Sequence, residues 1–312
     1  MSSRTLFRSV AMFLAAPFLL LACGGEQKTT SSTTHTAGES TPLVPASTVT
    51  TSPGSTATAV AVLDAVPPTY EDSEEALKAG RYAEAARGFE AYASRKPENS
   101  WGWYMLGYSS WKGGERERAL VAFDSALSRD PAHLKSLYNS ARVLFELGRP
   151  REALDRIETA IATDSTIAEG YRLLGRGYEE TGDPEGAASA YRHALILDEH
   201  DAWALNNLGV LYLKQGMPEE ALGPLARAVE LKPRSPVFQN NLGNALERTG
   251  SPVAAKAAYA AALDADQSYQ KARVNLERVS PLVSPDAGPE VDIGHVAEEF
   301  RFSLRVMIDS TR

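Results

Sequence analysis

The sequence contains a single cysteine, Cys23, among its 312 residues. One thiol cannot form a disulfide within the chain or supply the several thiolates of a cysteine metal site. No glycine-rich phosphate loop followed by Lys-Ser or Lys-Thr is present. The five histidines also lack metal-site spacing, such as two on one helical face beside a glutamate: His35, His133, His193, His200 and His295. We therefore expect no metal, no cofactor and no enzymatic activity.

Basic residues are outnumbered, with 32 lysines and arginines against 40 aspartates and glutamates, which gives a net charge of -8. The chain has no basic run or nucleic-acid motif. Because phosphate neutralisation needs clustered lysine and arginine, nucleic acid is excluded as an expected partner. The acidic excess favours solubility and keeps the protein away from anionic lipid headgroups.

An apolar run from residue 10 to 22 is short for a membrane span, and Arg4 and Arg8 precede it. A short apolar run behind positive charges is typical of an export signal. We interpret residues 1–22 as a signal peptide. A buried apolar helix is the alternative.

The run ends in Leu-Leu-Ala-Cys at residues 20–23 and resembles the lipobox of bacterial lipoproteins. The resemblance implies cleavage before Cys23 and acylation of its thiol. Gly24 stands where an aspartate would favour inner-membrane retention in enteric bacteria, so the resemblance implies an outer-membrane lipid anchor facing the periplasm. An ordinary secretory signal with a chance cysteine is the alternative.

Residues 23–65 beyond the anchor are rich in threonine, serine, alanine and proline, with almost no aromatic or charged side chains. Such a segment cannot bury enough apolar surface to fold. We predict a disordered linker, which serves either as a tether of selected length or as a tolerated spacer.

Two residue types then recur every 34 positions, which indicates a repeat array. The glycines are Gly80, Gly114, Gly148, Gly182, Gly216 and Gly250, and the alanines are Ala85, Ala119, Ala153, Ala187, Ala221 and Ala255. Aligned on the glycines, the blocks are 66–99, 100–133, 134–167, 168–201, 202–235 and 236–269. A repeat array is first of all a surface that holds partners.

Each block predicts a helix, a tight turn and a second helix. The glycine suits the left-handed conformation that ends a helix, and in four blocks a proline follows two residues later, where it suits a helix start. Position 8 of the block is small, whereas position 24 is large and apolar. We expect the large side chain to fill the space that the small one leaves.

These columns resemble the tetratricopeptide repeat. The second block carries the resemblance at Trp103, Leu106, Gly107, Gly114, Ala119, Phe123, Ala126 and Pro131. The resemblance implies an all-α, right-handed α-solenoid of six helix-turn-helix units over residues 66–279. Residues 270–279 resemble the first helix of a further unit and would form the capping helix. The first block departs most from the pattern, as expected of a terminal repeat.

Residues 280–312 form a predicted loop followed by an amphipathic segment. The apolar residues of this segment fit one helical face and also alternate like a strand. We predict a helix over residues 293–308, because an all-helical solenoid offers no sheet edge. This helix either packs on the array or lies in its groove.

The resemblance places positions 2, 5, 6, 9, 12 and 13 of each block in a concave groove lined by first helices. The predicted partner-binding residues at these positions are Trp101, Tyr104, Tyr108, Trp111, Tyr138, Asn139, Arg142, Arg172, Arg176, Asn206, Asn207, Asn240, Asn241 and Asn244, with Lys135 and Trp203 beside them. Aromatic side chains anchor apolar contacts, arginines fit carboxylates, and asparagines can bond the main chain of a peptide.

Each part of this surface also has a purely structural interpretation. Asn207 and Asn241 would then bond between adjacent helices. The three arginines would be solvated or paired with the acidic residues Glu169, Glu179 and Glu180. Four aromatic residues are expected in the core: Trp103, Tyr171, Tyr178 and Tyr212.

The sequence therefore predicts a membrane-anchored periplasmic adaptor that binds a peptide segment or a protein in its groove. It resembles lipoproteins that escort secretin or pilus components and those that dock peptidoglycan enzymes, and fold alone cannot choose between them. The alternative is a structural or oligomeric spacer whose groove is filled by its own tail or by a second copy.

Overall fold

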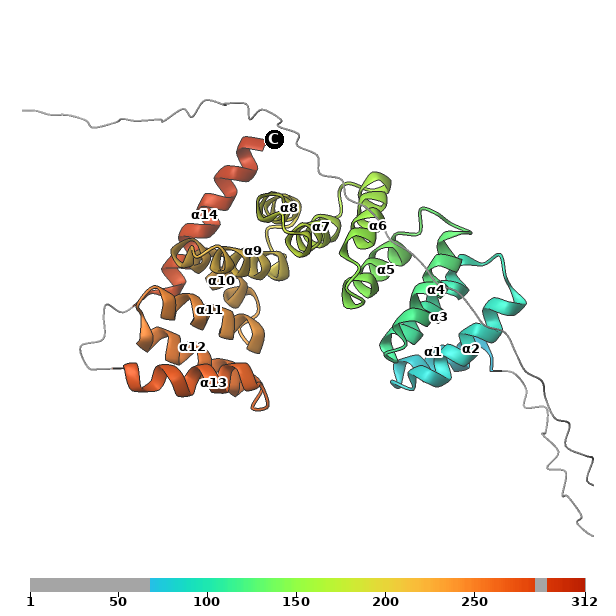
Figure 1. Cartoon of the computed structure of the whole chain (residues 1–312), viewed down its shortest axis with the longest axis horizontal. Helices are drawn as coiled ribbons and strands as arrows, with labels where there is room; N and C mark the ends of the chain where they lie inside the picture. Colours follow the sequence, from blue (N-terminus) through green and yellow to red (C-terminus); the bar gives the residue numbers. More distant parts are fainter. Residues whose placement is uncertain (1–67, 284–290, 312) are drawn as a thin grey trace, which may run out of the picture. The chain divides into compact units, whose positions relative to one another are not determined.

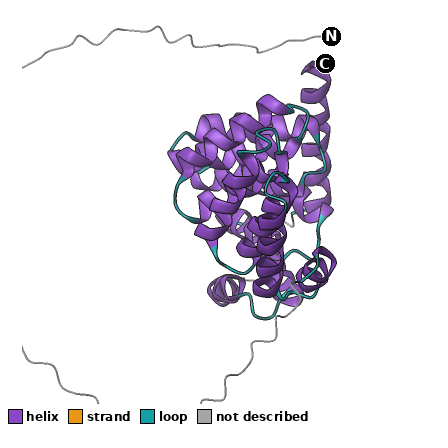
Figure 2. Ribbon diagram, turned by 90° about the vertical axis from the view of Figure 1, so that its right-hand side faces the viewer, coloured by secondary structure: helices purple, strands orange, loops and turns teal. Residues whose placement is uncertain are grey.

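The computed structural model describes residues 68–283 and 291–311. The predicted signal peptide, Cys23 and the whole of the predicted linker lie outside the described residues. Within the described ranges every regular element is a helix (Figure 2).

The helices of the array follow one another in pairs, and Figure 1 labels them in chain order. The pairs are α1 (Tyr70–Lys78) and α2 (Tyr82–Arg95), α3 (Ser100–Lys112) and α4 (Arg116–Leu127), α5 (Leu134–Glu146) and α6 (Pro150–Thr163), α7 (Ala168–Thr181) and α8 (Pro184–Leu197), α9 (Ala202–Lys214) and α10 (Pro218–Leu231), and α11 (Pro236–Arg248) and α12 (Pro252–Ala265). After them come α13 (Gln270–Val279), the short 3-10 helix η1 (Ser280–Leu282) and α14 (Ile293–Thr311).

Each pair turns at the glycine that recurs in the sequence. All six of these glycines have a positive φ, between 70° and 85°, which costs glycine no Cβ clash. At the third turn Gly148 donates to the carbonyl of Phe145 and Arg149 to that of Leu144, which together cap the end of α5. In four pairs the second helix then begins at a proline.

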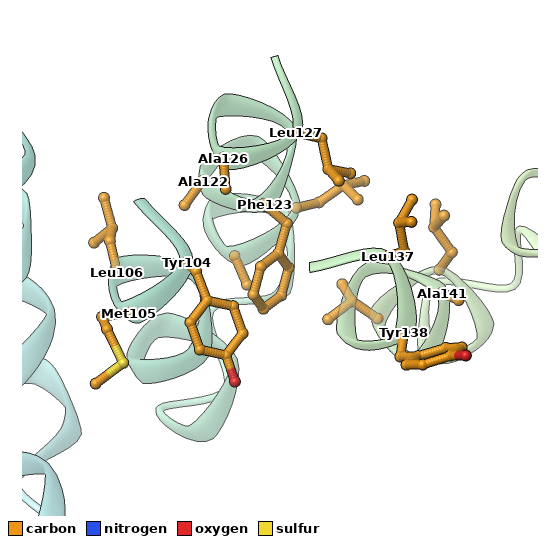
Figure 3. Packing of buried hydrophobic residues seen from close by; sticks show 14 of the residues in the cluster. Tyr104, Met105, Leu106, Ala122, Phe123, Ala126, Leu127, Leu137, Tyr138 and Ala141 are labelled. Carbon is orange, nitrogen blue, oxygen red and sulfur yellow. The ribbon is translucent and has the colours of Figure 1, made fainter. Parts of the chain in front are cut away.

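Packing within a pair depends on the small residue at position 8 of the block. A Cβ built on Gly107 of α3 would lie 2.7 Å from the ring of Phe123 in α4, and one on Gly243 would lie 2.6 Å from Tyr259. Both rings are fully buried. Figure 3 shows Phe123 between α4 and α3, close to Tyr104. The absent side chain therefore sets how closely the two helices approach.

The array ends at α13, which packs against α12 and α11. Ala272 and Val279 are its fully buried residues, whereas Val274 is exposed. The predicted all-α solenoid of six helix-turn-helix units with a capping helix is confirmed.

The C-terminal segment is helical, as predicted, and α14 packs against α10 and α8 (Figure 1). Its buried residues include Ala297 and Leu304. Gly223 of α10 makes room for the helix, because a Cβ there would lie 2.8 Å from Phe300. Since α10 and α8 are second helices of their pairs, the alternative in which this tail fills the groove is wrong for the described residues.

Candidate protein-binding face

Consecutive first helices of the array contact one another: α3 with α5, α5 with α7, α7 with α9, α9 with α11, and α11 with α13. Among the described helices, consecutive second helices make no contacts of comparable extent. The first helices are thus closer together and line the concave side of the array. We call the side that α3, α5, α7, α9, α11 and α13 present together the inner face.

Four aromatic residues run along α3 at spacings of three and four residues, so they lie on one side of the helix. The ring centroids of Trp101 and Tyr104 are 5.0 Å apart, those of Tyr104 and Tyr108 are 6.1 Å apart, and those of Tyr108 and Trp111 are 6.2 Å apart. We call these four residues the aromatic strip. The sequence prediction that brought them together on this face agrees with these contacts.

Tyr104 is the buried member of the strip. Its side chain is 8% exposed and contacts the ring of Phe123, and its hydroxyl accepts a hydrogen bond from Asn139 on α5 at 3.3 Å. Burial raises its pKa above the ordinary value of 10.0. Trp101, Tyr108 and Trp111 are half-buried. The structure thus places Tyr104 in the core, and the surface of the strip belongs mainly to the other three rings.

Two lysines lie against the rings of the strip. The Lys135 ammonium of α5 is 4.9 Å from the centroid of the Trp101 ring. The Lys112 ammonium is 5.6 Å from the Tyr108 ring and 5.5 Å from the Trp111 ring. Both lysines lie within the range of cation–π attraction, and both are exposed.

Tyr138 of α5, also predicted to bind a partner, is buried as well, and burial raises its pKa to about 12. Its hydroxyl has no hydrogen-bond partner in the described part of the chain. Gly170 of α7 packs beside it, since a Cβ there would lie 3.1 Å from that oxygen. The ring fills the space between α5 and α7.

The three predicted groove arginines all have carboxylate partners. Arg142 pairs with Glu169 across α5 and α7, as one sequence interpretation held. The guanidinium of Arg172 is 2.7 Å from Asp201, which also caps the start of α9. Arg176 is 2.7 Å from Glu180 and lies 4.4 Å from the Phe145 ring.

The asparagines mainly bond neighbouring first helices. Asn241 of α11 donates to Asn206 of α9 at 2.8 Å, and Asn275 of α13 donates to Asn240 of α11 at 2.9 Å. Asn206 and Asn240 are buried. The interpretation of Asn241 as a bond between adjacent helices is confirmed, whereas Asn207 only accepts from its neighbour Asn206, at 3.4 Å.

Asn244 lines an open pocket of about 510 Å³ near the end of the array. The other residues that line this pocket are Asn240, Asn241, Gln270, Lys271, Val274 and Asn275.

Residues 35 apart form these bonds in two registers. Position 5 of one block bonds position 6 of the next in the pairs Tyr104–Asn139, Asn206–Asn241 and Asn240–Asn275. Position 12 bonds position 13 of the next block in Trp111–Glu146, Glu179–Lys214 and the Leu213 carbonyl with Arg248. Reasoning from the sequence anticipated the bond of Asn241 and missed the other five, although polar residues 35 positions apart, one more than the repeat period, could have indicated several of them.

Models of the tetratricopeptide repeat match residues 70–133, 172–236 and 206–270, and a second model with the same description matches residues 110–176. The chain belongs to the tetratricopeptide repeat family. This repeat family consists of protein-binding scaffolds that are typically not enzymes. A comparison with curated proteins finds no match.

Several solved structures share the fold. A thermophilic TPR protein of Thermus thermophilus is 24% identical with a TM-score of 0.51, over 58% of this chain and 99% of that one. Pseudomonas aeruginosa PilF is 19% identical with a TM-score of 0.53, over 69% and 93%. The APC/C hetero-tetramer Cut9–Hcn1 gives 20% identity and a TM-score of 0.59, over 67% and 42%. At these identities the likeness shows the fold alone.

The inner face of this tetratricopeptide repeat protein presents half-buried aromatic rings and exposed lysines, which suit it chemically to binding. No cluster of three or more histidine, cysteine, aspartate or glutamate side chains able to hold a metal occurs within residues 68–283 and 291–311. No helix in the same ranges is long and apolar enough to cross a membrane. Trp203 of α9, which is 44% exposed, adds an aromatic surface on the inner face further along the array.

Proposed function

We propose that this protein is a membrane-anchored scaffold that holds a peptide segment or a surface of a partner protein on its inner face. The observation that carries the proposal is that α14 packs on the second helices α10 and α8, while Trp203 stays exposed on the first helix α9 and three rings of the aromatic strip stay half-buried on α3. Large exposed aromatic groups on a concave surface are typical binding anchors.

The proposed anchor is a lipid on Cys23, followed by the linker that places the array at a distance from the bacterial outer membrane, in the periplasm. Its support is the sequence: two arginines, a short apolar run and a cysteine in a lipobox-like context. An envelope system such as pilus assembly, secretion or cell-wall enzyme assembly would supply the partner.

Site-specific photo-crosslinking in a bacterial host tests the binding face. A photoreactive amino acid replaces Tyr108 or Trp203 on the inner face. For comparison it replaces Val121 of α4 or Val253 of α12, which are 67% and 50% exposed on second helices. We expect a discrete crosslinked partner from the inner positions only. Equal crosslinking from both sides would contradict the proposed binding face.

The anchor has a separate readout. Incorporation of an alkyne fatty acid and recovery in the membrane fraction should both be lost in Cys23→Ser, while crosslinking at Trp203 in purified protein mixed with envelope extract should remain. Unchanged labelling of Cys23→Ser would remove the anchor from the proposal without affecting the binding face.

A spacer built from several copies is the second candidate, and one observation favours it. Phe302 and Val306, four residues apart on α14, are 69% and 54% exposed, so they form a small apolar stripe. Light scattering of the full chain should show a dimer that Phe302→Ser and Val306→Ser together dissociate. A monomer at all concentrations would rule this candidate out.

A further inference from the structure

Charge on the inner face is unevenly compensated. Arg142, Arg172 and Arg176 each hold a carboxylate, so their charges are balanced within the array. Lys112 and Lys135, in contrast, take part in no ion pair among the described residues, and each faces only aromatic rings. The charges of Lys112 and Lys135 are therefore uncompensated, and both border the aromatic strip.

The two lysines lie at opposite ends of the strip. Lys135, in the first turn of α5, lies over Trp101 in the first turn of α3. Lys112 is the last residue of α3 and lies over Tyr108 and Trp111. Ten residues separate Trp101 from Trp111, which corresponds to about 15 Å along a helix. An extended chain covers that distance in about five residues.

We propose that the aromatic strip binds an extended acidic peptide segment, in which two carboxylates about five residues apart flank apolar residues. The inference rests on the proposed function and names the chemistry of the partner. Each carboxylate meets one lysine, and the apolar residues between them cover the half-buried rings of Trp101, Tyr108 and Trp111. The rings hold the ammonium groups in place without neutralising them, since cation–π attraction leaves the positive charge available to a carboxylate.

Charges on the neighbouring helices are already paired. Glu146 of α5 accepts from Trp111 at 3.0 Å and pairs with Arg116 at 2.6 Å, so its charge is balanced. The two arginines of the following first helix, α7, each hold a carboxylate as well. Because α7 offers no uncompensated positive charge, the two carboxylates of the segment are met on α3 and α5.

Selection from randomised peptides tests the inference with the full chain in detergent micelles. Two libraries are displayed, one ending in an amide and one in a free carboxylate, with eight randomised positions. We expect enrichment of aspartate or glutamate at two positions about five apart with apolar residues between. If both acidic positions are also enriched in the library that ends in an amide, both carboxylates belong to side chains. If only one acidic position is enriched in that library, the other carboxylate belongs to the chain terminus.

Matched charge variants complete the test on the most enriched peptide. Lys112→Gln with Lys135→Gln should weaken its binding about tenfold, the effect of two partly exposed ion pairs, and should flatten its salt dependence. Lys232→Gln with Lys256→Gln, which removes the same charge near α10 and on α12, should leave binding within about twofold.

Three outcomes overturn the inference. They are peptides without acidic enrichment, no enriched peptides at all, and equal binding by the two charge variants. The proposed function fails separately, if crosslinking from Tyr108 and Trp203 finds no discrete partner in the cell.

Discussion

Replacing Gly107 with alanine tests whether the small residue at position 8 sets the spacing of a helix pair. The new Cβ would lie 2.7 Å from two atoms of the Phe123 ring and 3.1 Å from the Ala119 carbonyl oxygen. The ring is fully buried and cannot move into solvent. Overpacking of this kind costs about 1–3 kcal/mol, while alanine in place of glycine inside a helix contributes about 1 kcal/mol. We expect a net loss of about 1 kcal/mol.

The third block shows which second substitution should relieve the clash, because it has Ala141 and Ile157 at the positions of Gly107 and Phe123. Gly107→Ala with Phe123→Ile should therefore be less destabilised than the sum of the single variants, by about 1 kcal/mol.

Urea unfolding followed by circular dichroism gives the total effect, and hydrogen exchange shows whether it lies in α3 and α4. This second readout is needed because repeat arrays can unfold in parts. Gly294→Ala, where only a carboxylate oxygen of Asp292 lies at 3.3 Å, is the control and should not destabilise. A stabilising Gly107→Ala would refute the reasoning.

Burial lowers the pKa of His133 below 6.5, so its contribution to stability is full above pH 6.5 and is lost as the pH falls through the folded-state pKa. His133→Asn should reduce the pH dependence of the urea midpoint between pH 7 and 5; an unchanged slope would contradict this. Tyr104→Ala should cost about 3–5 kcal/mol, because it empties a buried site, whereas Trp203→Ala should change the urea midpoint little; similar losses would contradict the assignment of core and surface. Leu304→Ala, at a buried position of α14, should raise hydrogen exchange in α14 alone; increased exchange throughout the repeats would show that α14 supports the whole array.

The fold could be predicted from the sequence because the repeat carries its own geometry. Gly148 ends one helix and Pro150 starts the next at fixed positions, and these are local effects of backbone conformation. The docking of α14 could not be predicted, because it depends on a contact between distant residues. Phe300 needs the space above Gly223, and the pattern of α14 shows an apolar face without showing its partner.

The inner face could be predicted only in part. The periodicity correctly brings Trp101, Tyr108 and Trp111 to one side of α3. It does not distinguish exposed from buried positions there, and Tyr104 is covered because position 5 lies nearest the next first helix, where Asn139 meets it. The partners of the arginines also depend on this approach: Arg172 pairs with the capping residue Asp201 rather than with a glutamate of its own helix.

The hydrogen bonds between residues 35 apart link consecutive first helices in the same way along the array, which makes the array modular. Block four interrupts the register between positions 5 and 6, since Leu173 stands opposite Tyr138 and the Tyr138 hydroxyl has no partner among the described residues. Removing one whole period, residues 167–200, would keep the cap at Asp201 and bring Asn207 to the position of Leu173. A tyrosine would then face an asparagine, as Tyr104 faces Asn139. A chain shortened by one unit should thus gain a bond that the present one lacks where α9 meets α5, while α14, which now packs on α10 and α8, would lose its contact with α8.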